Sequence, residues 1–406
     1  MKKIGLIIGL TLGFFLVFCS FNKHKEISLT FNLQPAERFI NLMNYLEKSN
    51  KNGFKNTQIS QEAKNQNLQL NKKDVELAKK IDSLLSLPIY NDFSENMMAL
   101  IDSTKYLGKE AYRNAFFSLP LECIRMRAGL PELWVKFWEN DYNSKAVSFL
   151  SEIAKQKDEI NKKVVNASLI FLPENIEAKK IEILFCFDGN RGCFATEDKI
   201  IMDMLSFQDF DISKFSNILA HELHHILYND YLSNYLSIDE KNQHQKALFS
   251  FQERIISEGI AQQINYKDYT NQVKALYNNE QLIKELYNEW ITSMREISKS
   301  NNPVECYEKA RSKMWNISEG KLKKYCTSKI ESRTMSHRPT IDYYISYQLY
   351  NSILQKGGVK KLKYVIEYPD CLLKEYNNVY TETLLIPKIP DDIVDLWKTN
   401  FKRKNT

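Results

Sequence analysis

The stretch ILAHELHHIL, residues 218–227, contains three of the chain's six histidines. His221 and His225 are four residues apart, so on a helix they lie one turn apart on the same face. At about 100° per residue, Phe215, Leu219 and Leu223 fall on a different side, where they can meet a core. The stretch therefore predicts an amphipathic helix whose polar side carries two neighbouring imidazoles.

Two imidazoles at this spacing can reach one metal ion, and Zn²⁺ is an ion that accepts such ligands. Glu222 points beside the pair and can reach a water molecule on that ion, which is the H-E-x-x-H arrangement. The alternative is an ordinary surface helix with polar residues opposite an apolar stripe. The scarcity of histidine in this chain argues against a chance match. His224 lies on the other side of His221, and we expect a supporting or surface group there instead of a ligand.

A catalytic zinc site needs three protein ligands, so the histidine pair lacks one. The downstream stretch FQERIISEGIAQQINY offers Glu258, followed by Gly259 and Ala261, small residues that would let this helix approach the first. Gln262, one turn after Glu258, is placed to orient a ligand histidine. Glu253 is the rival ligand, but it points elsewhere on the helix and lacks small neighbours. The predicted zinc ligands are His221, His225 and Glu258.

The sequence around these helices predicts a small sheet. ISLTFNL (27–33) and KIEILFCF (180–187) read as strands, and CFATEDKIIMDM (193–204) as one or two more. A helix from residue 35 follows the first strand, and mostly helices are expected between residues 74 and 172. The histidine helix is expected to start at a cap, Asp211 or Ser213, and to end near Tyr231. The fold class is therefore α+β, mostly α, with the histidine helix lying against a sheet.

The composition limits the kinds of molecule that the chain is expected to bind. The chain has 406 residues, 43% of them hydrophobic, and a formal net charge of +6. This length and apolar content fit a globular protein. Because the positive excess is spread along the chain, we expect no nucleic-acid partner. The sequence carries no signal for an oligomeric state.

The N-terminus is typical of an export signal. Two lysines precede an apolar run, residues 4–19, which is short for a membrane-spanning helix. The run ends at Cys19, which resembles the lipidated cysteine of bacterial lipoproteins, although Phe18 stands where that motif has a small residue. We therefore expect an exported protein, periplasmic or at the cell surface, with either a plain cleaved signal or a lipid anchor at Cys19. Among the other cysteines, Cys186 and Cys193 form the nearest candidate pair, but most are expected to be buried thiols.

HELHH followed by SEGIAQ resembles the gluzincin branch of zinc metallopeptidases, and more closely the uncharacterised bacterial families described as zinc-dependent peptidases. A third, weaker element is RPTIDYYISYQLYNSILQKGG, residues 338–358, which resembles their Tyr-rich helix. Three features depart from the pattern: the long gap between His225 and Glu258, Gln262 where those enzymes often have Asp, and Asp342 where the bacterial pattern tends to have Gly.

This resemblance implies a zincin-like catalytic core, a small mixed sheet packed on the H-E-x-x-H helix, and three regions after a signal at residues 1–20. These are a mostly helical region (27–175), the catalytic region (176–330) and a helical C-terminal region completing the cleft (331–406). It also implies hydrolysis of a peptide or protein substrate, with Glu222 as general base for a zinc-activated water. Tyr343 ranks first as oxyanion donor and His337 second, with Tyr344 as a further candidate.

The sequence also suggests a surface for substrate binding and leaves an alternative function. The strand edge at residues 192–197 is the candidate surface for an extended substrate. The alternative function is an exported binding or scaffold lipoprotein on a peptidase-like fold, with weak or no activity, because a fold does not fix a function.

Overall fold

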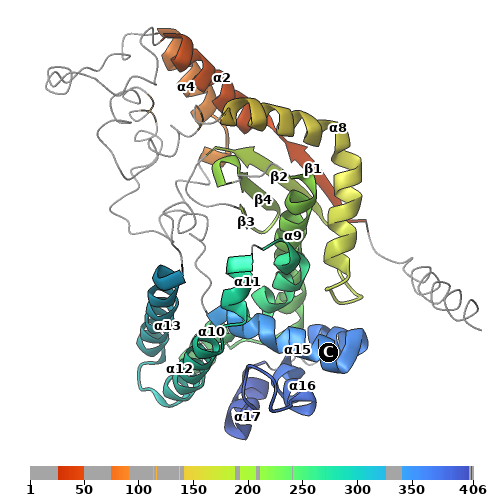
Figure 1. Cartoon of the computed structure of the whole chain (residues 1–406), viewed down its shortest axis with the longest axis vertical. Helices are drawn as coiled ribbons and strands as arrows, with labels where there is room; N and C mark the ends of the chain where they lie inside the picture. The colour runs from red at the N-terminus through yellow and green to blue at the C-terminus, as the bar shows by residue number, and fades with distance from the viewer. Residues whose placement is uncertain are drawn as a thin grey trace, which may run out of the picture.

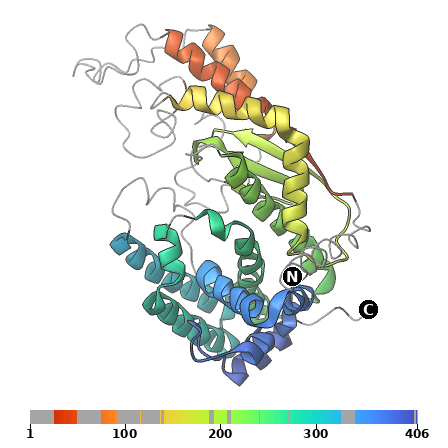
Figure 2. The same ribbon diagram turned by 45° about the vertical axis from the view of Figure 1, so that its right-hand side comes forward.

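The computed structural model describes residues 26–49, 75–90, 113, 116, 137, 141–187, 193–206, 211–239, 241–269, 271–325, 341–401 and 404. Within these ranges the protein is mostly helical and has one small mixed sheet (Figure 1). The predicted class, α+β and mostly α, is therefore confirmed. The sheet lies in one half of the molecule, and most helices after residue 243 form a second, purely helical half (Figures 1 and 2).

The sheet has four strands in the order β1-β2-β4-β3. Strands β1 (Ser28–Asn32), β2 (Lys180–Cys186) and β4 (Lys199–Asp203) run parallel, whereas the short edge strand β3 (Cys193–Ala195) is antiparallel to β4. All the strands expected from the sequence are present, and the stretch after residue 193 forms two of them.

The central strands are apolar because both of their faces are covered. From Ile183 onward every residue of β2 is buried, and the same is true of β4 from Ile200 onward. This continuous burial is typical of parallel strands between helical layers. Helix α2 (Gln34–Ser49) packs on β2, while α9 (Ile212–Tyr235) packs on β3 and β4.

Helix α8 (Tyr142–Leu169) runs along α9 and reaches β1, so it fixes the histidine helix from outside. Helix α4 (Val75–Leu85) packs on α2 at the far end of the sheet (Figure 2). One buried contact joins the α8–α9 pair directly: the Ser168 hydroxyl donates to the Ala220 carbonyl over 2.8 Å. The sheet and α8 thus hold α9 on both sides.

The helical half is built on two long helices that pack together, α10 (Gln243–Asn265) and α15 (Ile341–Glu367). The remaining helices surround them: α11 (Asn271–Tyr277), α12 (Glu280–Lys299), α13 (Pro303–Tyr325), α16 (Leu372–Val379) and α17 (Asp391–Asn400). Its apolar centre includes Trp290 and Trp397, both fully buried and edge to face. Among the described residues, no helix combines the length and apolar character needed to cross a bilayer.

The close approach of α10 and α15 corrects one expectation. Gly259 was expected to let α10 approach the histidine helix, but it faces α15 instead. A Cβ atom at Gly259 would lie 2.6 Å from Tyr350 Cδ2 and 2.9 Å from the backbone carbon of Ser346. The glycine is therefore required for the contact between these two helices.

Candidate metal centre

The histidine helix starts where its cap was predicted. The Asp211 carboxylate accepts from the backbone N–H groups of Ser213 (2.7 Å) and Lys214 (3.0 Å), so Asp211 is the cap and Ser213 is already inside the helix. Such capping satisfies N–H groups that have no partner within the helix. The helix then runs to Tyr235, one turn beyond its expected end.

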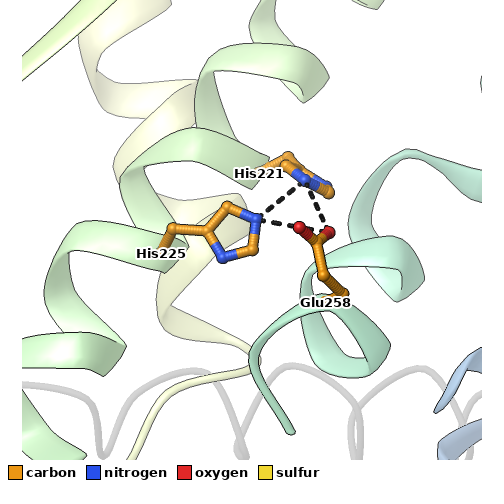
Figure 3. A group of neighbouring side chains, drawn as sticks. All are labelled: His221, His225 and Glu258. Carbon is orange, nitrogen blue, oxygen red and sulfur yellow. Dashed lines mark hydrogen bonds and ion pairs between the residues drawn. The ribbon is translucent and has the colours of Figure 1, made fainter. Parts of the chain in front are cut away.

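Three side chains converge where α9 meets α10 (Figure 3). The Nε2 atoms of His221 and His225 are 3.0 Å apart, and the Glu258 Oε2 atom lies 3.6 Å from the first and 3.5 Å from the second. One possible ligand atom from each residue lies within 4.8 Å of the others. The structure thus brings together the three residues that were predicted as zinc ligands.

These separations suit one small cation. Donor atoms at 2.0–2.1 Å from a tetrahedral ion lie about 3.3 Å from one another. The measured separations, 3.0 to 3.6 Å, bracket that value. Glu258 Oε2 is buried and makes no hydrogen bond, although it takes part in ion pairs with the two histidines. Two imidazoles and one carboxylate are a donor set that zinc accepts, so these residues fit that ion.

The electrostatics favour the metal-binding form at His221 and Glu258, whereas at His225 they favour the protonated ring, whose proton a metal ion would displace. Burial, followed by the charge of His225, lowers the pKa of His221 to about 4, which keeps its imidazole neutral. Burial alone would raise the pKa of Glu258, but the two histidines outweigh it and leave that pKa below its ordinary value. For His225, burial acts downward, while Glu258 raises the pKa above its ordinary value. A neutral imidazole and a deprotonated carboxylate are the forms that bind metals.

Glu222 lies on the sheet side of this group. Burial raises its pKa to about 8, with the charges of His225 and Glu258 acting next in opposite directions. Two groups of β3 stabilise its charged form, the backbone N–H of Ala195 and the thiol of Cys193. Glu222 is thus held between the metal ligands and the edge strand of the sheet.

Of the predicted oxyanion donors, Tyr343 is close enough to Glu258 and Glu222 for their charges to act on it. It is half-buried at the start of α15, and burial, followed by the charges of Glu258 and Arg254, leaves its pKa well above the ordinary value. Tyr344 is fully buried and packs on Tyr277, with ring centroids 4.9 Å apart. Tyr344 therefore belongs to the core. His337 lies outside the described residues.

Two supporting roles expected from the sequence differ in the structure. Gln262 accepts hydrogen bonds from the hydroxyls of Tyr269 (2.5 Å) and Tyr277 (3.1 Å), and its buried Nε2 atom has no partner, so it orients no histidine. His224 is fully buried, and its Nε2 atom lies 3.0 Å from the Phe171 carbonyl oxygen. The surface position considered for His224 was therefore wrong, because the ring lies in the core beside Phe171, just beyond the end of α8.

Glu253, the rival ligand, and the candidate cysteine pair take no part in the metal-binding group. Glu253 is absent from the converging group, and burial raises its pKa. Cys186 and Cys193 are not bonded to each other: both are free thiols, as are Cys306 and Cys371. Only Cys186 among these four is fully buried.

Two further residues near the site, Asn265 and Arg254, could have been predicted from their spacing to Glu258. Asn265 and Arg254 lie seven residues after and four residues before Glu258, so both share its helix face. The Asn265 side chain and the Ala261 carbonyl lie beside the His221 ring and raise its pKa against the effect of burial. Arg254 is exposed at the rim and lowers the pKa of Glu258.

Two further residues near Glu258 and Glu222 could not be predicted from any local pattern in the sequence. Tyr269 follows the short 3₁₀ helix Tyr266–Asp268 that comes after α10, and the charge of Glu258 adds to the burial that raises its pKa. Cys193 reaches Glu222 only because of the packing of β3 on α9. Contacts of this kind depend on tertiary register, which no short motif encodes.

Residues 27–383 match the family model described as "Putative zinc dependent peptidase (DUF5700)". The match covers most of the chain, and the protein belongs to this family. Neither the curated proteins nor the solved structures contain a significant match. The family description agrees with a buried group, His221, His225 and Glu258, that can hold a metal ion.

Proposed function

We propose that the protein is a zinc metallopeptidase with a zincin-like core of the gluzincin type. The observation that carries the proposal is the convergence of His221, His225 and Glu258, with Glu222 beside them. Three side chains from two helices converge, and the order of the four residues along the chain is that of an H-E-x-x-H helix followed by a glutamate helix. The family description supports the same chemistry.

The proposed roles follow from chemistry and position. His221, His225 and Glu258 would hold the zinc ion, which supplies a Lewis acid that polarises a carbonyl and activates water. Glu222 takes the proton of the attacking water and delivers it to the leaving amine. A pKa raised to about 8 suits this exchange, because such a group both accepts and releases protons near neutral pH.

Tyr343 is the proposed donor to the oxyanion, with His337 as the second candidate. The ring lies half-buried at the start of α15, close enough to Glu258 for that charge to act on it. A hydroxyl whose pKa is raised stays protonated and can donate where negative charge develops. The edge strand β3 is the proposed surface for an extended peptide, because it has one edge not paired with another strand of the sheet.

The decisive experiment measures zinc and peptide hydrolysis together. The mature chain and its His225→Ala and Glu222→Gln variants are purified, and their zinc content is measured by mass spectrometry. We expect about one zinc per chain in the parent and in Glu222→Gln, and little in His225→Ala. Glu222→Gln should lower turnover by about 10²–10⁴, because general-base catalysis contributes that much.

Two results would contradict this assignment. A Glu222→Gln protein without zinc would make Glu222 a ligand instead of a base. A parent protein that binds zinc but cleaves no peptide from a varied library would favour the binding or scaffold function.

We further propose that the protein is exported and tethered through Cys19. The support is the apolar run at residues 4–19, which lies outside the described residues. Fractionation of cells expressing the parent and Cys19→Ala chains tests this proposal. The parent should be found with membranes and the variant should be soluble outside the cytoplasm; equal distribution of both would rule out the anchor.

A further inference from the structure

A cavity lies at the C-terminal end of α9, between that helix, the loop after α8, the residue that follows α15, and Lys404. Its volume is about 470 Å³, within the range of sites that bind small molecules. Neither the two ligand histidines nor Glu258 is among its lining residues. Asp230 and Asn234, which do line it, lie about 160° around α9 from the midpoint of the histidine pair, at 100° per residue. The cavity is therefore separate from the metal centre.

Part of the cavity wall is aromatic. Tyr231 and Tyr235 stack with ring centroids 5.5 Å apart, and Tyr368 meets Tyr235 edge to face with centroids 6.4 Å apart. The Tyr231 hydroxyl is already used, because it donates to the Glu367 carbonyl over 2.7 Å. The Tyr235 hydroxyl likewise donates to the Asp370 carboxylate over 3.1 Å. What these two half-buried side chains offer to a ligand is therefore ring carbon instead of a hydroxyl group.

Exposed polar side chains also line the cavity. Asn175 and Asn234 are exposed amides, and Glu177 is an exposed carboxylate. Each amide offers a carbonyl oxygen that accepts and an NH₂ group that donates, while the carboxylate only accepts. These side chains can therefore bind groups that donate and accept at once, which is the property of a hydroxyl group.

The charges around the cavity balance. Glu177 and Asp230 are acidic, and Asp230 forms an ion pair with Lys179. Lys404 supplies a second basic group, whose Nζ atom donates to the Ser233 carbonyl over 2.6 Å. An anion would meet two carboxylates, and a quaternary ammonium ion, which aromatic walls can also bind, would meet two lysines. A neutral ligand meets no such repulsion.

We propose that this cavity binds a neutral saccharide unit. One face of a sugar ring is made of C–H groups, whose weak positive charge is attracted to the negative face of a tyrosine ring. The sugar hydroxyls donate and accept, and so do the exposed amides. A purely apolar ligand would instead leave polar groups of the cavity without hydrogen-bond partners. The inference does not rest on the peptidase function, because the cavity and the metal centre share no residue.

The binding test uses the purified mature chain and three neutral trisaccharides: maltotriose, cellotriose and the β-1,4-linked trimer of N-acetylglucosamine. Titration calorimetry measures the Kd of each sugar, and saturation-transfer-difference NMR shows which sugar protons touch the protein. We expect at least one trisaccharide to bind with a Kd of about 1 mM or lower. Its ring C–H protons should receive the most saturation, because they are the groups that meet the tyrosine rings.

Substitutions test whether the sugar binds in this cavity. Asn234→Ala should weaken binding about three- to tenfold, the effect of one modest hydrogen bond. Asn229→Ala is the matched control, because Asn229 is also an exposed amide on α9 but does not line the cavity. Tyr235→Phe should keep the affinity, since its hydroxyl already donates to Asp370, whereas Tyr235→Leu should weaken binding about three- to tenfold through loss of the ring. Thermal scans of every variant report whether it is folded.

Three results would overturn the saccharide site. These are no saturable binding of any trisaccharide up to about tenfold above the expected Kd, unchanged affinity in Asn234→Ala, and an equal loss of affinity in Asn229→Ala. Tetramethylammonium chloride and sodium acetate are titrated as charged probes, and tighter binding of either than of every trisaccharide would assign the cavity to an ion. If Tyr235→Leu does not fold, the two asparagine variants still decide. Zinc-dependent hydrolysis is measured separately, so either function can fail without the other.

Discussion

At the scale of single residues, the site depends on how burial and neighbouring charges compete. Burial disfavours any charge, so it lowers the pKa of His221 and acts to raise that of Glu258. The facing histidines reverse the effect at Glu258, which stays deprotonated. His221 and Glu258 are thus held in the forms that bind a metal. The placement of the two histidines on one helix face could be predicted because helical spacing is a local property.

Tyr343→Phe tests the oxyanion donor at the same scale. Removing one such donor typically lowers kcat by about 10²–10³, while zinc content should not change. Tyr344→Phe is the matched control, since that ring packs on Tyr277 in the core, and its variant should keep its turnover. His337→Ala is assayed beside them on the same peptide. If both Tyr343→Phe and His337→Ala turn over within about tenfold of the parent, neither residue is the donor.

Asn265→Ala tests the orientation of His221. Residues that orient a ligand histidine typically contribute about 10–100-fold to metal affinity, and Asn265 lies beside the His221 ring. We expect a zinc affinity weaker by about that factor, measured by competition with a chelator of known affinity. Asn265→Asp should retain the affinity, because a carboxylate at this position can also accept a hydrogen bond from the His221 ring. Unchanged affinity in Asn265→Ala would leave the Ala261 carbonyl as the group that orients His221.

At the scale of elements, α10 packs against two helices, α9 and α15, with different faces. One face presents Glu258 to α9, and another lets α15 approach at Gly259. The sequence showed that a helix with small residues follows the histidine helix, but it did not show which neighbour the glycine meets. A glycine in a sequence indicates that a neighbouring element can come close, but it does not indicate which element does so. This contact was therefore assigned to the wrong helix.

Gly259→Ala tests the packing of α10 on α15. The new methyl group would lie 2.6 to 2.9 Å from atoms of Tyr350 and Ser346, including a backbone atom that cannot rotate away. Overpacking of this kind costs about 1–3 kcal/mol, which should outweigh the gain of about 1 kcal/mol in helix propensity. The free energy of unfolding in urea should therefore fall.

Gly357→Ala is the matched control on α15. The three atoms nearest to its methyl group would all belong to the Lys361 side chain, at 2.6 to 3.1 Å, and none of them is a backbone atom. This variant should lose less stability than Gly259→Ala. If Gly259→Ala matched Gly357→Ala in stability, the two helices would have room to separate without cost.

The strands were easier to predict than the contacts between layers. β2 and β4 are continuous apolar runs because helices cover both faces, and such runs are visible in sequence. By contrast, Cys193 reaches Glu222 through the register of a three-residue edge strand on α9. Register between distant segments depends on the packing of the whole core, so the proximity of Cys193 to Glu222 had no sequence signal.

At the scale of the whole molecule, the site joins its two halves. α9 belongs to the sheet half and α10 to the helical half (Figure 2). Hydrogen bonds also connect the halves: the Tyr228 hydroxyl donates to the Ile366 carbonyl over 2.9 Å, and Asn217 donates to Asp268 over 2.7 Å. A metal ion held by residues of both helices would add a further cross-link at this junction.

Zinc should therefore stabilise the folded chain. A ligand that binds only the folded state at a free concentration a thousandfold above its Kd stabilises that state by about 4 kcal/mol. Thermal scans of the chelator-treated protein, with and without added zinc, measure the effect as an increase in Tm. Glu222→Gln should show the full increase, because its three proposed ligands are intact, and His225→Ala should show almost none. An equal increase in His225→Ala would place the stabilising zinc somewhere other than the junction of α9 and α10.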